Sequence, residues 1–202
     1  MGKKNGIYCI ETSHWRDGET QQPSVDKLLG LIEDTQGIPY IHRDFSTKEE
    51  LEFLLTEATQ KKFSSFPVIY VASHGEERNL WVRQKVGKTL PASRIGLDEL
   101  REMLKGRGKG KILFFSACGL MKGNASHLKK FLKETGIKAL VGYQRNVSWI
   151  ESAQLELGLL PELANCATWH FGSLKKAFKK ITPANRSLIK SLELRSYPNL
   201  LP

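Results

Sequence analysis

The sequence predicts an α/β protein, a three-layer α/β/α sandwich around a mostly parallel central sheet of about six strands. Three observations lead to this fold class. Short apolar runs typical of buried strands alternate with amphipathic segments of helical period along the whole chain. The connections between most strand-like runs are long enough to hold a crossover helix, which parallel neighbours need. The length, 202 residues, suits one ordinary core, so we expect residues 1–202 to form a single domain.

The first part of the chain predicts three strands and two helices. A strand over Gly6–Glu11 precedes a helix that Ser24 can cap and Gly37 ends. A second strand over Ile38–His42 precedes a helix opened by a capping box, formed by Ser46 and Glu49. The third strand is the apolar part of FPVIYVASHG, which runs from Phe66 to Gly75.

The middle of the chain predicts a hairpin, a helix and a fourth strand. Residues Asn79–Pro91 alternate in polarity on either side of Gly87, which indicates a hairpin at the edge of the sheet. A helix begins near Asp98, where an acidic residue favours a helix N-terminus. The fourth strand is the run KILFFSACG, from Lys111 to Gly119.

The last part of the chain predicts a fifth strand among helices. A helix over Ser126–Thr135 is closed by Gly136, and Ile137–Tyr143 follows as a strand. The remaining elements are helices over Ile150–Leu163 and Leu174–Lys180, a short helix opened by Pro183, and a last strand within Ser187–Pro198.

Composition and charge exclude several classes of protein. Apolar residues make up 40% and charged residues 26% of the chain, a balance that argues against disordered and fibrous classes. No apolar stretch reaches membrane-spanning length, and the amino terminus has no apolar signal region, so we expect a cytoplasmic protein without a membrane partner. The net charge of +10 is spread over small clusters, which indicates solvated faces rather than a nucleic-acid motif.

Of the three cysteines, Cys118 has a functional context. An odd number of widely spaced cysteines makes no disulfide framework, and without a CxxC pair or a local His/Cys cluster we expect no metal and no cofactor. Cys9 lies inside an apolar run and is interpreted as a small buried hydrophobe, while Cys166 has no base near it in sequence.

Two strand-like runs end on the residues of a cysteine-peptidase dyad. One run stops at His74 and the other at Cys118. Ligands of open α/β sheets bind at the carboxyl ends of parallel strands, so both side chains are expected at the functional edge. A neighbouring imidazole can lower the pKa of a thiol, which makes the thiol a nucleophile.

These motifs resemble those of caspase-like cysteine peptidases of clan CD, and most closely the bacterial CHAT-type domains. The resemblance rests on SHGE at Ser73–Glu76 and SAC at Ser116–Cys118, in an order and spacing close to the caspase pattern. The segments WRDG, at 15–18, and GYQRNVSW, at 142–149, look like the substrate-binding loops of that family. The resemblance implies a caspase-like fold and a cysteine endopeptidase, with a bacterial stress or defence role by analogy alone.

The resemblance also implies roles for individual residues. Cys118 would be the nucleophile and His74 the general acid and base. The backbone amides of Gly75 and Cys118 would form the oxyanion hole, and Arg16, Ser116 and Trp149 would contact the substrate. The partners implied are a protein or peptide substrate and an activating protein.

The expected substrate specificity of caspases does not carry over. Arg16 matches one of the two arginines that hold the substrate aspartate, but Ser116 replaces the glutamine and Ile150 replaces the second arginine. Specificity for basic residues is not expected either, because Ser116 offers no acid beside the cysteine. Two alternatives stay open: an inactive binding or scaffold module that kept the fold, and a basic protein associated with nucleic acid.

Overall fold

A six-stranded sheet forms the middle layer of the protein, whose computed structural model describes residues 4–13, 24–83, 92–166 and 171–202. The strand order is β2-β1-β3-β7-β8-β9. The neighbouring pairs are parallel except β8 and β9, which run antiparallel. The strands are β1 (Ile7–Thr12), β2 (Tyr40–Phe45), β3 (Val68–Ala72), β7 (Ile112–Ser116), β8 (Ala139–Tyr143) and β9 (Leu194–Tyr197).

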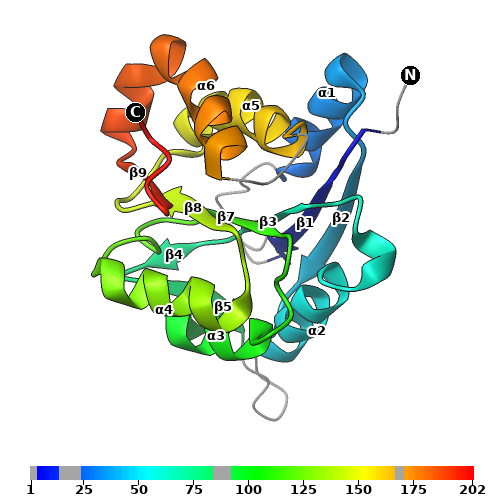
Figure 1. Cartoon of the computed structure of the whole chain (residues 1–202). Helices are drawn as coiled ribbons and strands as arrows, with labels where there is room; N and C mark the ends of the chain where they lie inside the picture. The colour runs from blue at the N-terminus through cyan, green and yellow to red at the C-terminus, as the bar shows by residue number, and fades with distance from the viewer. Residues whose placement is uncertain (1–3, 14–23, 84–91, 167–170) are drawn as a thin grey trace.

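Helices cover both faces of this sheet (Figure 1). One face carries α1 (Asp26–Gln36), α5 (Trp149–Ala164) and α6 (Phe171–Ser191), and the other carries α2 (Lys48–Ala58), α3 (Leu97–Leu104) and α4 (Ala125–Thr135). A short 3-10 helix, η2 (Lys61–Phe63), precedes β3. The predicted three-layer sandwich with a mostly parallel sheet of about six strands is therefore confirmed.

Buried side chains form two apolar clusters, one on each face of the sheet. Successive residues of a strand point to opposite faces. In β3, Tyr70 and Ala72 belong to the cluster on the α1 and α5 side, whereas Ile69 and Val71 belong to the other cluster. This alternation decides which residues at the strand ends face α5.

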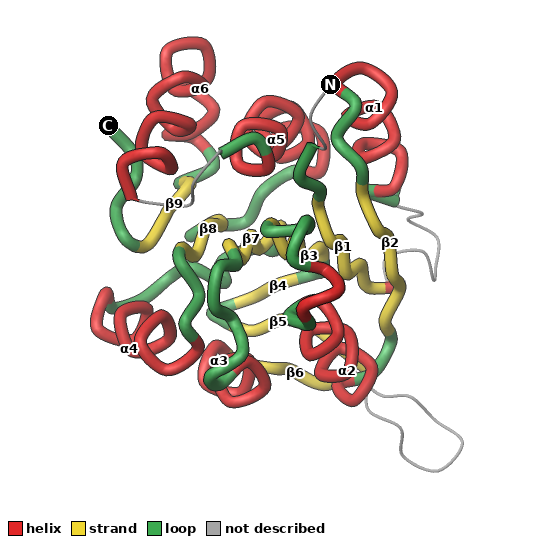
Figure 2. Tube along the Cα trace, turned by 45° about the vertical axis from the view of Figure 1, so that its right-hand side comes forward, coloured by secondary structure: helices red, strands yellow, loops and turns green. Residues whose placement is uncertain are grey.

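The predicted hairpin exists but does not lie at the edge of the main sheet. β5 (Asn79–Arg83) and β6 (Ala92–Gly96) join β4 (Gly75–Glu76) in a separate antiparallel sheet of three strands, visible below the main sheet in Figure 2. Glu77 and Arg78 join β4 to β5 with φ values of 44° and 74°. Positive φ at both turn residues is the geometry of a tight hairpin turn, so β5 pairs with the strand just before it.

Several predicted boundaries shift by a residue or two. The capping box of α2 uses Thr47 and Glu50 rather than Ser46 and Glu49, with the Glu50 N–H donating to the Thr47 hydroxyl at 3.2 Å. Gly37 and Gly136 end α1 and α4 as predicted, each with a positive φ.

Two helices follow the described start at Phe171, as predicted, and meet at a kink within α6. The kink lies at Asn185, whose φ and ψ of −118° and 15° are not helical, two residues after Pro183, where the second helix was expected to begin. The predicted last strand is the shorter β9, because residues up to Ser191 belong to α6.

Candidate active site

The register of two central strands brings His74 and Cys118 to the same edge of the sheet. β3 and β7 are parallel neighbours in which Ala72 faces Ser116. The Ser73 N–H donates to the Ser116 carbonyl at 3.2 Å, which carries the pairing one residue past β3. The same offset, continued one step further, sets His74 opposite Cys118.

The chain after His74 lies directly against the backbone of Cys118. A Cβ atom placed on Gly75 would be 2.4 Å from the Cys118 carbonyl oxygen and 2.9 Å from the Cys118 nitrogen. Real side chains do not reach such distances, so this approach requires glycine. The glycine after the histidine therefore fixes how closely the two strand ends approach each other.

Two backbone N–H groups lie near each other at this contact. The Trp81 N–H donates to the His74 carbonyl at 3.0 Å, which makes Gly75 and Leu80 a non-hydrogen-bonded pair of the β4-β5 ladder. The Gly75 N–H consequently points away from β5. Gly75 lies close to the Cys118 nitrogen. The Gly75 N–H and the Cys118 N–H, which are the two donors expected for an oxyanion hole, are therefore in the same region.

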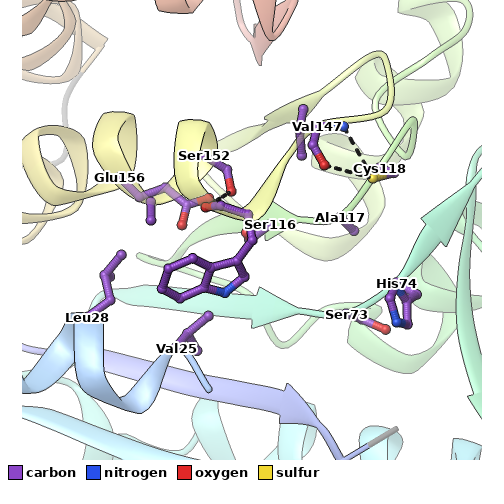
Figure 3. A pocket seen from close by; sticks show the side chains of 12 residues that line it. Val25, Leu28, Ser73, His74, Ser116, Ala117, Cys118, Val147, Ser152 and Glu156 are labelled. Atoms are coloured by element: carbon purple, nitrogen blue, oxygen red, sulfur yellow. Dashed lines mark hydrogen bonds between the residues drawn. The ribbon is translucent and has the colours of Figure 1, made fainter. Parts of the chain in front are cut away.

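The thiol of Cys118 contacts the backbone of Val147. The Val147 N–H donates to Sγ at 3.4 Å, and Sγ lies 3.8 Å from the Val147 carbonyl oxygen (dashed lines in Figure 3). Val147 belongs to the connection between β8 and α5. These two contacts hold the sulfur against the segment that leads into α5.

His74 and Cys118 line the same two hollows. One is an enclosed cavity of about 70 Å³ that extends under α5, and the other is a wider groove of about 450 Å³ that also contacts Glu76, Trp81 and Asn146. Burial lowers the pKa of His74 below its ordinary value of 6.5. The imidazole is therefore mostly neutral at pH 7 and able to accept a proton.

The smaller cavity is also lined by Glu156, an acidic residue that was not among the predicted site residues. Ser116, Trp149, Ser152, Ala153 and Glu156 line this cavity, the last four from one face of α5 at helical spacing (Figure 3). Glu156 is 1% exposed. An acid on an otherwise apolar helix face was a signal in the sequence, since a charged residue is rarely buried without a partner.

Two tyrosine hydroxyl groups hold Glu156. Tyr70 of β3 donates to Oε2 at 2.6 Å, and Tyr143 of β8 donates to Oε1 at 2.8 Å. The nearby Ser116 hydroxyl also favours the charged form of the carboxylate. Burial raises the pKa of Glu156 and outweighs these hydrogen bonds, which leaves the pKa at about 7. The acid is therefore well fixed in position but poorly compensated in charge.

The other predicted substrate contacts have different outcomes. Ser116 and Trp149 both line the cavity, although Trp149 also packs against the apolar cluster beside α5. Arg16 lies outside the described residues. Ile150, which stands where the second arginine was sought, is 74% exposed at the start of α5.

The remaining cysteines are buried and lie apart from these hollows. Cys9 is fully buried in β1, as predicted, and burial raises its pKa well above the ordinary value. Burial also raises the pKa of Cys166 to about 11. All three cysteines are free thiols.

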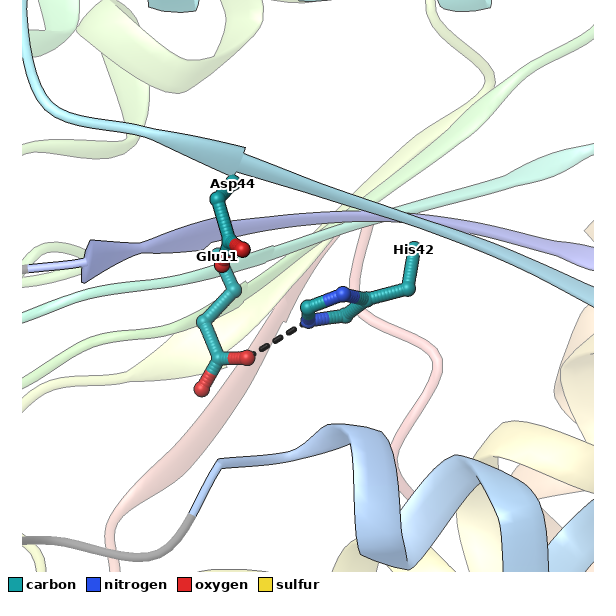
Figure 4. A group of neighbouring side chains, drawn as sticks. All are labelled: Glu11, His42 and Asp44. Atoms are coloured by element: carbon teal, nitrogen blue, oxygen red, sulfur yellow. Dashed lines mark hydrogen bonds and ion pairs between the residues drawn. The ribbon is translucent and has the colours of Figure 1, made fainter.

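A second cluster of titratable groups lies at the ends of β1 and β2 (Figure 4). Glu11, His42 and Asp44 bring ligand atoms within 4.8 Å of one another. Glu11 accepts from Ser24 at 2.5 Å and from the Val25 N–H at 3.0 Å, and it pairs with His42 at 2.6 Å. Its carboxylate thus connects β1 to the start of α1 and to His42.

The basic cluster at Lys105–Lys111 contains a buried lysine. Lys111 is 4% exposed, and its Nζ donates to the carbonyls of Phe63 and Phe66 at 2.7 and 2.8 Å. The lysines at 175, 176, 179 and 180 are exposed on α6, as expected for a solvated face. Within the described ranges, no helix combines the length and the apolar character needed to cross a bilayer.

Comparison with known proteins gives a family but no activity. Residues 4–192 match the model of a family of unknown function, DUF6642. No curated protein matches the chain. A solved structure described as "structure of pro-sf-caspase-1" is similar at 14% identity and a TM-score of 0.49, over 92% of this chain and 83% of the other.

Proposed function

Because the chain belongs to the DUF6642 family, whose function is unknown, we propose a function from the site itself: a cysteine endopeptidase that hydrolyses peptide bonds through Cys118 and His74. The observation that carries the proposal is the register of β3 and β7, in which Ala72 faces Ser116, two residues before His74 and Cys118 at the carboxyl ends of adjacent parallel strands. Both side chains also line one cavity and one groove, so a single substrate can contact both.

The first half of the reaction forms an acyl-enzyme. The Cys118 thiol gives its proton to His74, and the thiolate attacks the carbonyl carbon of the scissile bond. The N–H groups of Gly75 and Cys118 stabilise the negative oxygen of the tetrahedral intermediate. The C–N bond then breaks as His74 protonates the leaving amine, which leaves a thioester on Cys118.

The second half releases the acid. His74 takes a proton from a water molecule, and the resulting hydroxide attacks the thioester carbonyl. The C–S bond breaks, the sulfur recovers its proton from His74, and the product leaves as a carboxylic acid that ionises in water. Each residue returns to its starting state, and the chemistry needs neither metal nor redox partner.

The biological setting extends the same proposal. The resemblance of the SHGE and SAC motifs to CHAT-type domains adds a cytoplasmic role in a bacterial stress or defence response, with an activating partner protein. The inactive-module alternative predicts the same fold without turnover. The nucleic-acid alternative draws on the exposed lysines of α6 and predicts binding that weakens steeply as salt rises.

A peptide library with every residue type at the cleaved position tests the peptidase proposal. We expect cleavage by the wild-type chain, none by Cys118→Ala, and a loss of about 10²- to 10⁴-fold in His74→Gln, since general acid and base catalysis contributes that much. Cys166→Ala is the matched control, because its buried thiol lies apart from the site and its loss should leave the rate unchanged.

Alkylation by iodoacetamide distinguishes the peptidase from the inactive module. A peptidase thiol should react at Cys118 faster than a free cysteine, and His74→Gln should slow the reaction. Cleavage that survives in Cys118→Ala contradicts the proposal. So does an absence of cleavage together with ordinary, His74-independent alkylation, which would favour the inactive module.

A further inference from the structure

The cavity beside Cys118 has a mixed lining. Glu156, Ser116 and Ser152 contribute polar groups, and Val25, Leu28 and Trp149 contribute apolar ones. Cys118 and His74 also line it, and in Figure 3 they lie on the side away from Glu156. A side chain that entered here would leave its own backbone carbonyl beside the thiol.

The carboxylate of Glu156 in this cavity has hydrogen-bond donors but no positively charged partner among the described lining residues. Tyr70 and Tyr143 each donate one hydrogen bond to Glu156, although the two carboxylate oxygens offer about four acceptor sites. Among the described residues that line the cavity, none is a lysine or an arginine. A buried carboxylate without a counter-cation is costly, and a ligand that brings one would remove that cost.

On the premise of the proposed peptidase function, we propose that this cavity binds the side chain of the residue whose carbonyl is attacked, and that Glu156 selects a lysine or arginine there. The apolar lining residues suit the methylene stem of such a side chain, and Glu156 pairs with its cation at the end. Glu156 is then a specificity residue, supplied by α5 instead of by the segment next to the cysteine.

Size and charge exclude the other substrate classes. The volume of about 70 Å³ corresponds to roughly five water-sized positions, so the cavity has room for a side chain and not for a larger ligand. An aspartate or glutamate would meet the Glu156 carboxylate with no described cation to offset the repulsion. An apolar side chain would gain no charge-assisted hydrogen bond from Glu156, whose carboxyl, with its pKa raised to about 7, would take up a proton instead.

A comparison of lysine with norleucine isolates the cation, since the two side chains share the same unbranched stem. Dye-labelled peptide mixtures carry lysine, arginine, norleucine or aspartate at the selected position and random residues elsewhere. Their binding to the Cys118→Ala chain is followed by fluorescence anisotropy, and their hydrolysis by the wild-type chain is followed separately. We expect the lysine or arginine mixture to bind about 10- to 100-fold more tightly than norleucine, the range of a charge-assisted hydrogen bond.

Glu156→Gln should remove this preference. The glutamine keeps the shape of the side chain and can still accept from one tyrosine, so we expect a ratio of lysine to norleucine within about threefold of unity. Glu162→Gln is the matched control, because Glu162 lies on the same helix but pairs with Lys180 at 2.5 Å and does not line the cavity. Circular dichroism and thermal denaturation check that each variant is folded.

The two proposals fail in different ways. If the Cys118→Ala chain binds the lysine and norleucine peptide mixtures equally, the specificity inference is overturned. This result does not depend on whether Glu156→Gln folds. A preference that Glu156→Gln retains also overturns it. If the lysine preference is found but the wild-type chain cleaves nothing, the peptidase proposal fails while the basic-side-chain pocket stands.

Discussion

Replacing Gly75 by alanine tests whether the close approach of the two strand ends is needed. The added methyl group would lie 2.4 Å from the Cys118 carbonyl oxygen and 2.9 Å from its nitrogen. Both neighbours are backbone atoms, so neither can rotate away as a flexible side chain would. A favourable separation is about 3.5 Å, so the two segments must move apart by about 1 Å.

The size of the expected effect follows from this displacement. Overpacking of a closely packed site costs about 1 to 3 kcal/mol, which for a chain of this size lowers the Tm by about 2 to 12 °C. The catalytic consequence is larger, because a misplacement of about 1 Å can reduce a rate about 10²-fold. We therefore expect Gly75→Ala to fold but to lose most of the proposed peptidase activity and of the fast Cys118 alkylation expected with it.

Two assays on two variants separate the outcomes. Thermal denaturation reports stability, and the rates of library cleavage and of Cys118 alkylation report the site. Gly172→Ala is the matched control, since no heavy atom lies within 4 Å of its added methyl group and its stability should be unchanged or higher. A Gly75→Ala chain with wild-type Tm and wild-type rates would refute the reasoning that the glycine sets the spacing.

Three further predictions concern stability. The stabilising effect of the ion pair between His42 and Glu11 depends on pH. Burial opposes the charge on both groups, but hydrogen bonds outweigh burial. They lower the pKa of Glu11 from 4.5 and raise the pKa of His42 from 6.5. The contribution of Glu11 is lost as pH falls through its lowered pKa, and that of His42 is lost as pH rises through its raised pKa. His42→Gln should therefore cost most, about 1.5 to 3 kcal/mol, between pH 4.5 and 6.5, and a constant difference in urea denaturation across pH would contradict this. Burial lowers the pKa of Lys111 from 10.5 to about 8, so between these pH values the unfolded chain binds more protons than the folded chain. The free energy of unfolding of the wild-type chain should therefore rise by roughly 2 to 4 kcal/mol from pH 8 to pH 10.5 in urea denaturation. Lys111→Met should abolish this rise. Thr47→Ala removes the capping box of α2 and should cost about 0.5 to 2 kcal/mol in urea denaturation, whereas an unchanged midpoint would mean that the cap is not needed.

Elements with local signals were predictable from the sequence. The strands that carry the candidate dyad are continuous apolar runs that end at polar or small residues, and such runs are typical of buried parallel strands. Gly37 and Gly136 end their helices because both adopt a left-handed conformation that costs other residues more. The placement of His74 and Cys118 at one edge of the sheet followed from these strands, because parallel neighbours end at the same edge.

Features set by tertiary structure were not predictable. Glu77 and Arg78 both adopt positive φ in the turn, which their residue types seldom do. The turn was therefore not visible in the sequence, and neither was the pairing of β5 with β4 outside the main sheet. Glu156 was missed for a related reason. Its acidity and its apolar helix face are visible in the sequence, but the helix face that covers the cavity depends on how α5 packs over Tyr70 and Tyr143.

The hydrogen bond from the Trp81 N–H to the His74 carbonyl connects His74 to a different sheet from the one that precedes Cys118. Cys118 follows a strand of the main sheet, whereas the backbone of His74 is tied to the small sheet through β5. The Ser73 N–H also donates to the Ser116 carbonyl, and the Arg78 N–H of the small sheet donates to the Gly119 carbonyl just after Cys118. The spacing of His74 and Cys118 therefore depends on hydrogen bonds from both sheets, and a change in either sheet reaches both residues through the backbone.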